Sequence, residues 1–209
     1  MTQLTQVTLD FATAARLPLR DCYDWHQAVW KAFPGRDGKQ RDFLTRLDRR
    51  RDGFRLLIVS PLPPVRPDWC PADPDSWKTK AIPGNYFTRR QYAFQLCANP
   101  TKKVTKFNPD SSPTKNGRRV PLRTREEQIA WIIRKGEQGG FIVDEGKLRT
   151  FSRGREYFEK QGVPGLHSAV EFQGVLTVTD PAKFHESFRR GIGSAKAFGF
   201  GLLVIAPIA

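Results

Sequence analysis

The sequence predicts an α+β protein built from two tandem halves of similar outline. Segments in which polar and apolar residues alternate, as in half-buried strands, are interrupted by segments with helical spacing. Turn-forming Pro, Gly, Asn and Asp residues stand between these segments. A strand, a helix and further strands open the first half, and the same order returns in the second. The sequence therefore predicts two domains, at residues 1–88 and 89–209.

In the first half, Asp21 can cap a helix that continues to Phe33, where Pro34 ends it. Residues 61–76 carry six prolines and are expected to be irregular, with at most one helical turn. Two of the expected strands flank an Asp-Gly turn, which is a hairpin signal. The strands expected here are residues 3–10, 42–50, 54–60 and 77–82. Strand, helix, strand, strand is the opening of a ferredoxin-like unit.

In the second half, Thr124 and Glu127 form a capping box ahead of a helix that Gly136 can end. A shorter helix is expected at residues 181–190, and the polar, basic residues 101–119 are expected to form a loop. The expected strands are residues 91–98, 141–143, 148–158, 169–178 and 202–205. The halves share no detectable sequence similarity, so their likeness is one of element order alone.

The charge of the chain indicates a polyanionic partner. There are 35 Lys and Arg residues against 21 Asp and Glu, a formal net charge of +14. Such a surplus repels itself in a compact fold, and it serves binding to nucleic acid or to an anionic membrane. Nucleic acid is favoured, because the sequence has neither a long basic amphipathic helix nor a lipidation motif. We also expect no signal peptide, no membrane span and a location in the cytoplasm.

Three cysteines, spaced widely and odd in number, offer neither a disulfide framework nor a metal knuckle: Cys22, Cys70 and Cys97. The three histidines are isolated from one another and from acidic clusters, so no metal site and no cofactor are expected. His167, in a segment that reads as a turn, and His185, on a short helix, are expected to be exposed to solvent.

His26 is the strongest candidate for chemistry. At helical spacing it lies at the edge of an apolar stripe, with Tyr23 and Trp30 beside it. An imidazole at such an edge can pack against the apolar core on one side and face a ligand on the other. A histidine side chain also exchanges protons near neutral pH. Spacing alone leaves the alternative open that His26 is an ordinary, partly buried histidine.

Basic side chains gather in two further segments. Residues 101–135 hold ten Lys or Arg against three acids, and a second run lies between residues 149 and 160, interleaved with aromatic residues. Basic groups contact phosphates and aromatic faces stack on bases, although either segment alone could be a solvated loop. Near the C-terminus, the glycines of residues 191–201 could admit a phosphate to the backbone beside Lys196, or serve close packing.

Taken in order, several stretches resemble the CasE family of CRISPR endoribonucleases, which process precursor RNA within the type I-E Cascade complex. They span residues 2–207. The stretches are Tyr23 to Trp30 with Phe33-Pro34, Ala98 to Lys102, Arg119 to Leu122, Glu127 to Ile132, Phe172 to Leu176, and Gly191 to Pro207. No motif matches residues 61–76 or 106–117, and Gln95 and Cys97 stand where the family often has arginines.

The resemblance implies two ferredoxin-like (RNA-recognition-motif-like) domains and cleavage at the 3′ base of a CRISPR repeat hairpin. The 2′-OH would attack its own phosphate without a metal, leaving a 2′,3′-cyclic phosphate and a 5′-OH. His26 matches the family's catalytic histidine and would transfer a proton at either the attacking 2′-OH or the leaving 5′-oxygen. Tyr23 matches the tyrosine that assists this histidine in the family. The product would stay bound within Cascade, in contact with other subunits, such as a backbone subunit, and with DNA only through the complex.

The residues expected to contact RNA come from the basic runs and the glycine-rich segment. They are Lys102, Lys103, Arg118, Arg119, Arg149, Arg153, Arg155, Lys160, Gly193, Lys196, Gly199 and Gly201. Two rival interpretations remain. The first is a non-catalytic RNA-binding subunit of the same architecture, and the second is a sequence-specific DNA binder, which is disfavoured because no helix-turn-helix pair is evident.

Overall fold

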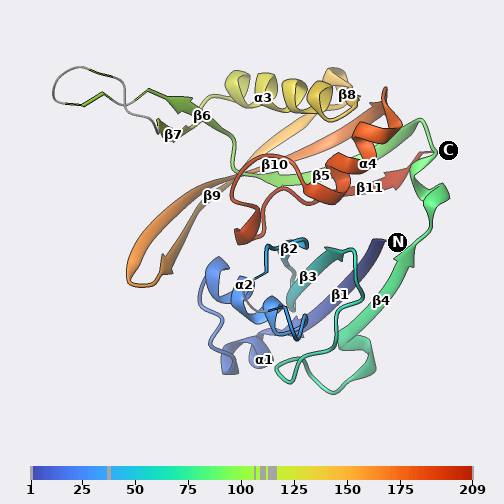
Figure 1. Ribbon diagram of the computed structural model, residues 1–209, viewed down its shortest axis with the longest axis vertical. Helices are drawn as coiled ribbons and strands as arrows, with labels where there is room; N and C mark the ends of the chain where they lie inside the picture. Colours follow the sequence, from blue (N-terminus) through green and yellow to red (C-terminus); the bar gives the residue numbers. More distant parts are fainter. Residues whose placement is uncertain (1, 37–38, 106, 109–111, 113–116, 209) are drawn as a thin grey trace.

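The computed structural model describes residues 2–36, 39–105, 107–108, 112 and 117–208. Its N-terminal part contains one four-stranded antiparallel sheet with two helices on one face (Figure 1). The elements are β1 (Thr2–Asp10), α1 (Phe11–Arg16), α2 (Cys22–Trp30), β2 (Leu44–Arg49), β3 (Gly53–Ser60), the 3-10 turn η1 (Pro74–Ser76) and β4 (Trp77–Ile82). The strand order β2-β3-β1-β4 is that of a ferredoxin-like unit.

The proline-rich segment takes the place of the second helix of this unit. Within residues 61–76 the only helical turn is η1, with Pro74 at its start. Proline lacks the backbone N–H that a helix interior needs, so six prolines in this segment prevent a longer helix. The expectation of an irregular segment is confirmed.

The C-terminal part repeats the topology. Its sheet has the order β11-β5-β10-β8, with β9 also paired to β10, and α3 and α4 cover the face away from the N-terminal part (Figure 1). The elements are η2 (Gly84–Phe87), β5 (Gln91–Ala98), β6 (Thr101–Val104), β7 (Arg118–Pro121), α3 (Arg125–Gln138), β8 (Phe141–Val143), η3 (Glu145–Lys147), β9 (Arg149–Lys160), β10 (Val163–Val178), α4 (Pro181–Arg190), η4 (Lys196–Phe198) and β11 (Leu203–Pro207). The predicted α+β fold of two tandem ferredoxin-like units is confirmed.

Two of the three apolar clusters among the described residues are large and hold the molecule together. The first lies between α2 and the N-terminal sheet and includes Val7, Trp25 and Val29. The second fills the C-terminal part and continues across to the other sheet, where Leu44 and Leu57 belong to it. Because side chains alternate between the faces of a strand, β2 and β3 bury one face under the helices and the other against the C-terminal part. The two units therefore share a packed interface.

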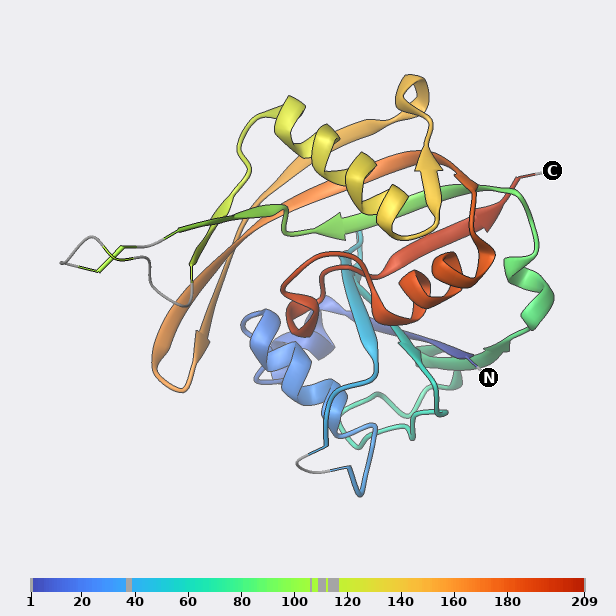
Figure 2. The same ribbon diagram turned by 45° about the horizontal axis from the view of Figure 1, so that its top comes forward.

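Several local predictions were wrong. Helix α2 ends at Trp30 instead of Phe33. Helix α1, capped by Asp10, was not expected. Residues 101–119 are not all loop, because β6 pairs with β7; these exposed strands bury no face and so lack apolar alternation. Helix α3 continues two residues past Gly136, whose missing side chain lets Phe141 pack against the helix. Strand β10 begins at Val163 instead of residue 169, in a long hairpin with β9 (Figure 2).

Candidate functional site

His26 lies on α2, half-buried and held by aromatic neighbours. The Asp21 carboxylate caps this helix by accepting hydrogen bonds from the backbone N–H groups of its first turn. The buried stripe of α2 includes Trp25 and Val29, and His26 lies at its edge, as predicted. Its Nε2 accepts a hydrogen bond from Trp30 Nε1 at 3.1 Å, and its Nδ1 is buried without a hydrogen-bond partner among the described residues.

The surroundings of His26 keep its imidazole neutral. Burial, together with the positive charges of Arg41 and Lys160, lowers its pKa from 6.5 to about 4. Because Nε2 accepts from the indole, the proton of the neutral ring is on Nδ1. The ring is thus a neutral proton acceptor at pH 7, in a cationic environment that would attract a phosphate.

We expect the His26 imidazole to titrate near pH 4 in the free protein, with the Nδ1–H tautomer above that pH. In Trp30→Phe the indole donor is lost while an aromatic ring is retained. Since that donor bonds to the neutral imidazole, its removal raises the pKa of His26, which burial and the charges of Arg41 and Lys160 still hold below 6.5. Imidazole nitrogen shifts measured by NMR across pH 3–8 report both quantities; an unchanged pKa in Trp30→Phe would mean that the indole does not control His26.

Tyr23, the other predicted catalytic residue, begins an aromatic contact between α2 and the C-terminal part. Its ring centroid is 6.3 Å from that of Phe198, which in turn lies 4.3 Å from Phe158 and 4.8 Å from His167. These rings come from α2, η4, β9 and β10 (Figure 2). The cluster therefore fixes the β9–β10 hairpin and the glycine-rich segment beside the helix that carries His26.

Contrary to the prediction, the other two histidines are not exposed to solvent. His167 is in β10 instead of a turn, where its Nδ1 is 3.1 Å from the Asn99 amide nitrogen and its ring stacks on Phe158. Burial lowers the pKa of His167. His185 is half-buried with its ring centroid 4.7 Å from that of Phe87. Both predictions failed because aromatic partners far along the chain cover these rings.

A single carboxylate ties α2 to the hairpin. Besides capping α2 with Oδ1, Asp21 accepts a hydrogen bond from the backbone N–H of Glu159 with Oδ2, at 2.9 Å. Glu159 stands beside Lys160, the hairpin cation whose charge acts on His26. The position of Lys160 relative to His26 is thus fixed through Asp21.

The glycine-rich segment brings Lys196 towards Arg41. Lys196 Nζ donates to the Arg190 carbonyl at 2.8 Å, and burial together with the charge of Arg41 lowers its pKa. Gly201 (φ +85°) packs so closely that an added Cβ would lie 2.6 Å from the Ile192 carbonyl, whereas Gly199 (φ +83°) has open space around it. Gly193 lies against the Trp131 ring. Close packing therefore explains Gly201 and Gly193.

Arg41 is a functional candidate that sequence reasoning missed. It is half-buried just before β2, donates to the Phe43 carbonyl, and places its guanidinium carbon 5.8 Å from the Phe43 ring centroid. Its charge acts on both His26 and Lys196. Only the chain reversal between α2 and β2 brings it there, and a single arginine in a polar segment gives no signal of this in the sequence.

The predicted cations of β9 do not form one surface. Residue 153 is the extra residue of a β-bulge, because Ala169 pairs with Gly154 and Val170 with Ser152. Arg153 lies instead between the two units, 3.3 Å from Glu171 and 3.5 Å from Asp48. Arg149 and Arg155 are exposed. By strand alternation Arg155 lies on the face opposite Lys160. Of the four, only Lys160 is brought to His26.

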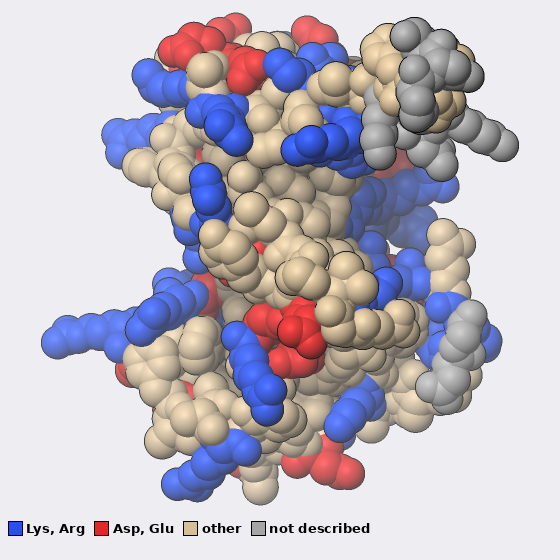
Figure 3. Space-filling model, turned by 90° about the vertical axis from the view of Figure 1, so that its left-hand side faces the viewer, with Lys and Arg blue, Asp and Glu red and all other residues tan. Residues whose placement is uncertain are grey.

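The other predicted cations lie on and beside the β6–β7 hairpin. Lys102, Lys103, Arg118 and Arg119 are exposed, and Lys102 pairs with Glu127 at 2.9 Å. Arg119 also lines a hollow of about 380 Å³ together with Lys196 and Gly193. Lys106 and Lys115 lie outside the described residues. Lys and Arg side chains are spread over this side of the molecule, with smaller groups of acidic side chains among them (Figure 3).

Among the described residues, no group of three or more His, Cys, Asp or Glu side chains is arranged to hold a metal ion. In the same part of the chain, no helix has both the length and the apolar character needed to cross a lipid bilayer.

Comparison with known proteins places this chain among CRISPR proteins. A family model described as CRISPR associated protein matches residues 3–207. The CRISPR system Cascade subunit CasE of Escherichia coli is 34% identical over 198 residues, covering 93% of this chain and 96% of that protein. The CRISPR-associated endoribonuclease Cse3 of Thermus thermophilus is 32% identical, covering 98% and 99%.

The similarity extends to the fold. The structure of Thermus thermophilus Cse3 bound to an RNA representing a pre-cleavage complex has a TM-score of 0.72 and 29% identity with this chain, and the match covers 99% of each. The resemblance seen in the sequence is confirmed. Since the family model and both relatives span nearly its whole length, the chain belongs to the CRISPR-associated protein family.

Proposed function

We propose that the chain is a metal-independent endoribonuclease that cleaves CRISPR repeat hairpins in precursor RNA and keeps the product within Cascade. The observation that carries the proposal is a half-buried His26 on α2 whose pKa is lowered by burial and by the charges of two cations, Arg41 and Lys160. It occurs in a chain aligned along its length with an endoribonuclease whose structure holds a pre-cleavage RNA. An imidazole so placed can exchange a proton while the cations hold a phosphate.

In the proposed reaction, the ribose 2′-oxygen attacks its adjacent phosphorus, forming the 2′,3′-cyclic phosphate as the bond from phosphorus to the 5′-oxygen breaks. His26 Nε2 accepts the 2′-OH proton once its hydrogen bond with Trp30 opens, and water protonates the departing 5′-oxygen. The lowered pKa of His26 favours this role over that of the acid. Tyr23 donates its phenolic hydrogen to a phosphate oxygen, and Arg41 and Lys160 balance the developing negative charge.

For RNA binding we propose the cations around this centre together with the β6–β7 and β9–β10 hairpins. Lys160 and Lys196 would hold phosphates near the cut, while Lys103, Arg118 and Arg119 would hold the stem. We propose domain limits of 1–88 and 89–209, contacts with other Cascade subunits, and a cytoplasmic location. DNA would be met only through the assembled complex, as part of which relatives have been solved.

One observation favours a second candidate function, a non-catalytic RNA-binding subunit. Nε2 of His26 is engaged by Trp30, and its Nδ1 is buried. If this state persisted with RNA bound, the ring would be purely structural.

Cleavage in the presence of EDTA decides between the two. We expect the protein to cut the CRISPR repeat RNA of its own genome once, at the 3′ base of the hairpin, in excess EDTA, and to leave a scrambled-stem RNA intact. Binding of the repeat without cleavage, either in EDTA or with added Mg²⁺, would support the non-catalytic subunit. Cleavage restored only by Mg²⁺ would contradict the metal-independent reaction.

We also expect hairpin affinity to fall steeply with salt, because bound phosphates release their counterions. With about six to ten phosphate contacts, affinity falls about 10³–10⁵-fold between 50 and 200 mM salt. Fluorescence anisotropy of a labelled hairpin at four salt concentrations measures how the affinity depends on salt. An affinity that does not change with salt would mean that these cationic surfaces do not bind the RNA phosphates.

A further inference from the structure

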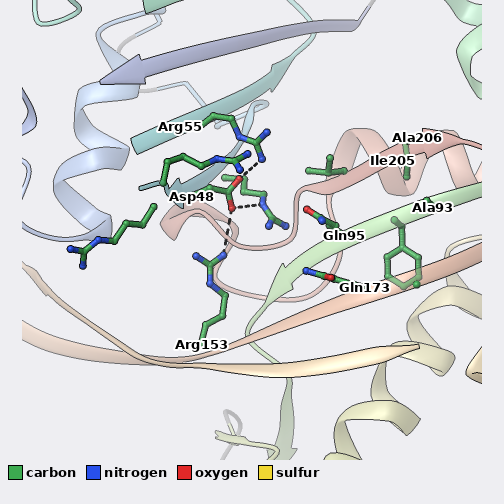
Figure 4. A pocket seen from close by; sticks show the side chains of 14 residues that line it. Asp48, Arg55, Ala93, Gln95, Arg153, Gln173, Ile205 and Ala206 are labelled. Carbon is green, nitrogen blue, oxygen red and sulfur yellow. Dashed lines mark hydrogen bonds and ion pairs between the residues drawn. The ribbon is translucent and has the colours of Figure 1, made fainter. Parts of the chain in front are cut away.

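A second cationic cleft opens between the two sheets, apart from the surroundings of His26. It has a volume of about 680 Å³ and is lined by β2 and β3 on one side and by β5, β9, β10 and β11 on the other. In Figure 4, Asp48 and Arg55 from one unit and Arg153 from the other point toward one another. It shares no lining residue with the hollows that contain Arg41, Arg119 and Lys196. The proposed cleavage site therefore does not account for this cleft.

Arginines outnumber carboxylates in this cleft. The five that line it are Arg46, Arg49, Arg50, Arg55 and Arg153. Asp48 pairs with Arg46 at 2.9 Å and Arg55 at 2.6 Å, and Glu171 pairs with Arg46 at 2.9 Å. Two acids thus serve three arginines of this partly buried network. Arg49 and Arg50 make no ion pair among the described residues, and the guanidinium carbon of Arg49 lies 5.3 Å from the Phe11 ring centroid.

Two buried donors in the network lack an acceptor. Arg46 Nη1 and Arg55 Nε have no hydrogen-bond partner among the described residues, and the Arg46 side chain is only 5% exposed. An unpaired buried donor of a charged group costs free energy, so such donors favour an incoming anion or carbonyl oxygen. Phosphate oxygens and base carbonyls both supply such an acceptor.

The residues at the floor of the cleft could bind a nucleobase. Gln95 on β5 and Gln173 on β10 are register partners, and both amides point into the same space (Figure 4). Small residues, Ala93, Gly174 and Ala206, line the cleft beside them. A side-chain amide can both donate to and accept from the edge of an unpaired base, and small residues let a base lie close to the sheet.

Strand β9 connects the cleft to the proposed cleavage centre. Arg153 lines the cleft, and Lys160 lies seven residues along the same strand (153 to 160). At about 3.3 Å per residue this is about 23 Å, which a single strand spans with about seven stacked nucleotides. A volume of 680 Å³ accommodates a drug-sized ligand, hence about one or two nucleotides and not a duplex.

From these observations we propose that the cleft binds single-stranded RNA that flanks the repeat hairpin, with arginines on its phosphates and Gln95 and Gln173 on a base. This site rests on the proposed function for the hairpin itself, and it adds a second contact that guides precursor RNA. The flank is the strand on either the 5′ or the 3′ side of the hairpin, and the experiment has one arm for each.

The test compares three uncleavable RNAs, each with a 2′-deoxy residue at the cut: the bare hairpin, and the hairpin with ten unpaired nucleotides on its 5′ or 3′ side. We expect one extension to tighten binding at least about fivefold in the unaltered protein. Arg50→Glu reduces this gain below about twofold without changing affinity for the bare hairpin. Arg51→Glu is the matched control, because this adjacent exposed arginine does not line the cleft, and it keeps the gain.

Gln95→Ala combined with Gln173→Ala provides a second variant that changes no charge. It is expected to lower the gain about threefold or more and to remove any preference among extensions of different base sequence. No gain from either extension, or an equal loss in Arg50→Glu and Arg51→Glu, would overturn the cleft as an RNA site. In both cases cleavage of an all-ribose bare hairpin by the unaltered protein, measured separately, would leave the proposed function standing, whereas failure to cleave it would contradict that function itself.

Discussion

Replacing His26 by alanine is expected to slow cleavage of the repeat hairpin by about 10²–10⁴-fold, the usual contribution of a positioned proton-transfer group. Hairpin affinity should change by less than about threefold, because the phosphates are held by cations and not by this neutral ring. Single-turnover cleavage with enzyme in excess measures the rate, and anisotropy with an uncleavable hairpin measures affinity. If His26 takes part in proton transfer, the cleavage rate must fall while the hairpin affinity stays nearly unchanged.

His185→Ala is the matched control for His26→Ala. His185 is also a half-buried histidine on a helix, in contact with the Phe87 ring, but it lies on α4 of the other unit. Its removal should leave cleavage unchanged. A parallel loss of affinity and rate in His26→Ala would indicate that the ring only supports the fold of α2. Unchanged cleavage would remove His26 from the mechanism altogether.

Removing Glu171 is expected to destabilise the protein by about 3–5 kcal/mol, the largest stability effect that we predict. Glu171 on β10 accepts from Arg46 Nη2 at 2.9 Å and from Arg153 at 3.3 Å, and the Arg46 and Glu171 side chains are only 5% and 6% exposed. In Glu171→Ala these arginines lose a buried countercharge at the junction of the two units. The midpoint of urea unfolding reports the loss.

Glu186→Ala is the surface counterpart of this change. Glu186 pairs with Arg189 and Arg190 on α4 but is 47% exposed, so its removal should cost less than about 1 kcal/mol. A double variant, Arg46→Met with Glu171→Met, should be more stable than Glu171→Ala, because both buried charges are then absent. If Glu171→Ala and Glu186→Ala lowered the free energy of unfolding equally, the ion pairs of Glu171 would not be what stabilises the junction of the two units.

Local patterns in the sequence predicted the elements around the site. Asp21 ahead of an apolar stripe predicted α2 and placed His26 at the edge of that stripe, and the structure confirms both. The capping box of Thr124 and Glu127 likewise predicted α3. These signals are local, since a cap and a helical stripe depend on residues within two or three turns of each other. The same holds for the proline-rich segment that replaces a helix.

Contacts between distant segments were beyond sequence reasoning. Nothing near Arg46 in the sequence indicates Glu171, which is 125 positions away. The bulge that turns Arg153 away from its neighbours depends on the pairing of β9 with β10. Arg41 reaches His26 only after the chain folds back from α2. The position of the candidate residue His26 on its helix was thus predicted, whereas its electrostatic surroundings, apart from Lys160, were not.

In the proposed reaction, the 2′-OH at the cut attacks its own phosphate with His26 as proton acceptor. A repeat RNA with a single 2′-deoxy substitution at the nucleotide 5′ of the cut lacks this nucleophile. We expect this RNA to bind with unchanged affinity and to remain uncut, whereas the all-ribose RNA yields a 2′,3′-cyclic phosphate and a 5′-OH. Cleavage of the deoxy RNA at the same position would contradict this reaction.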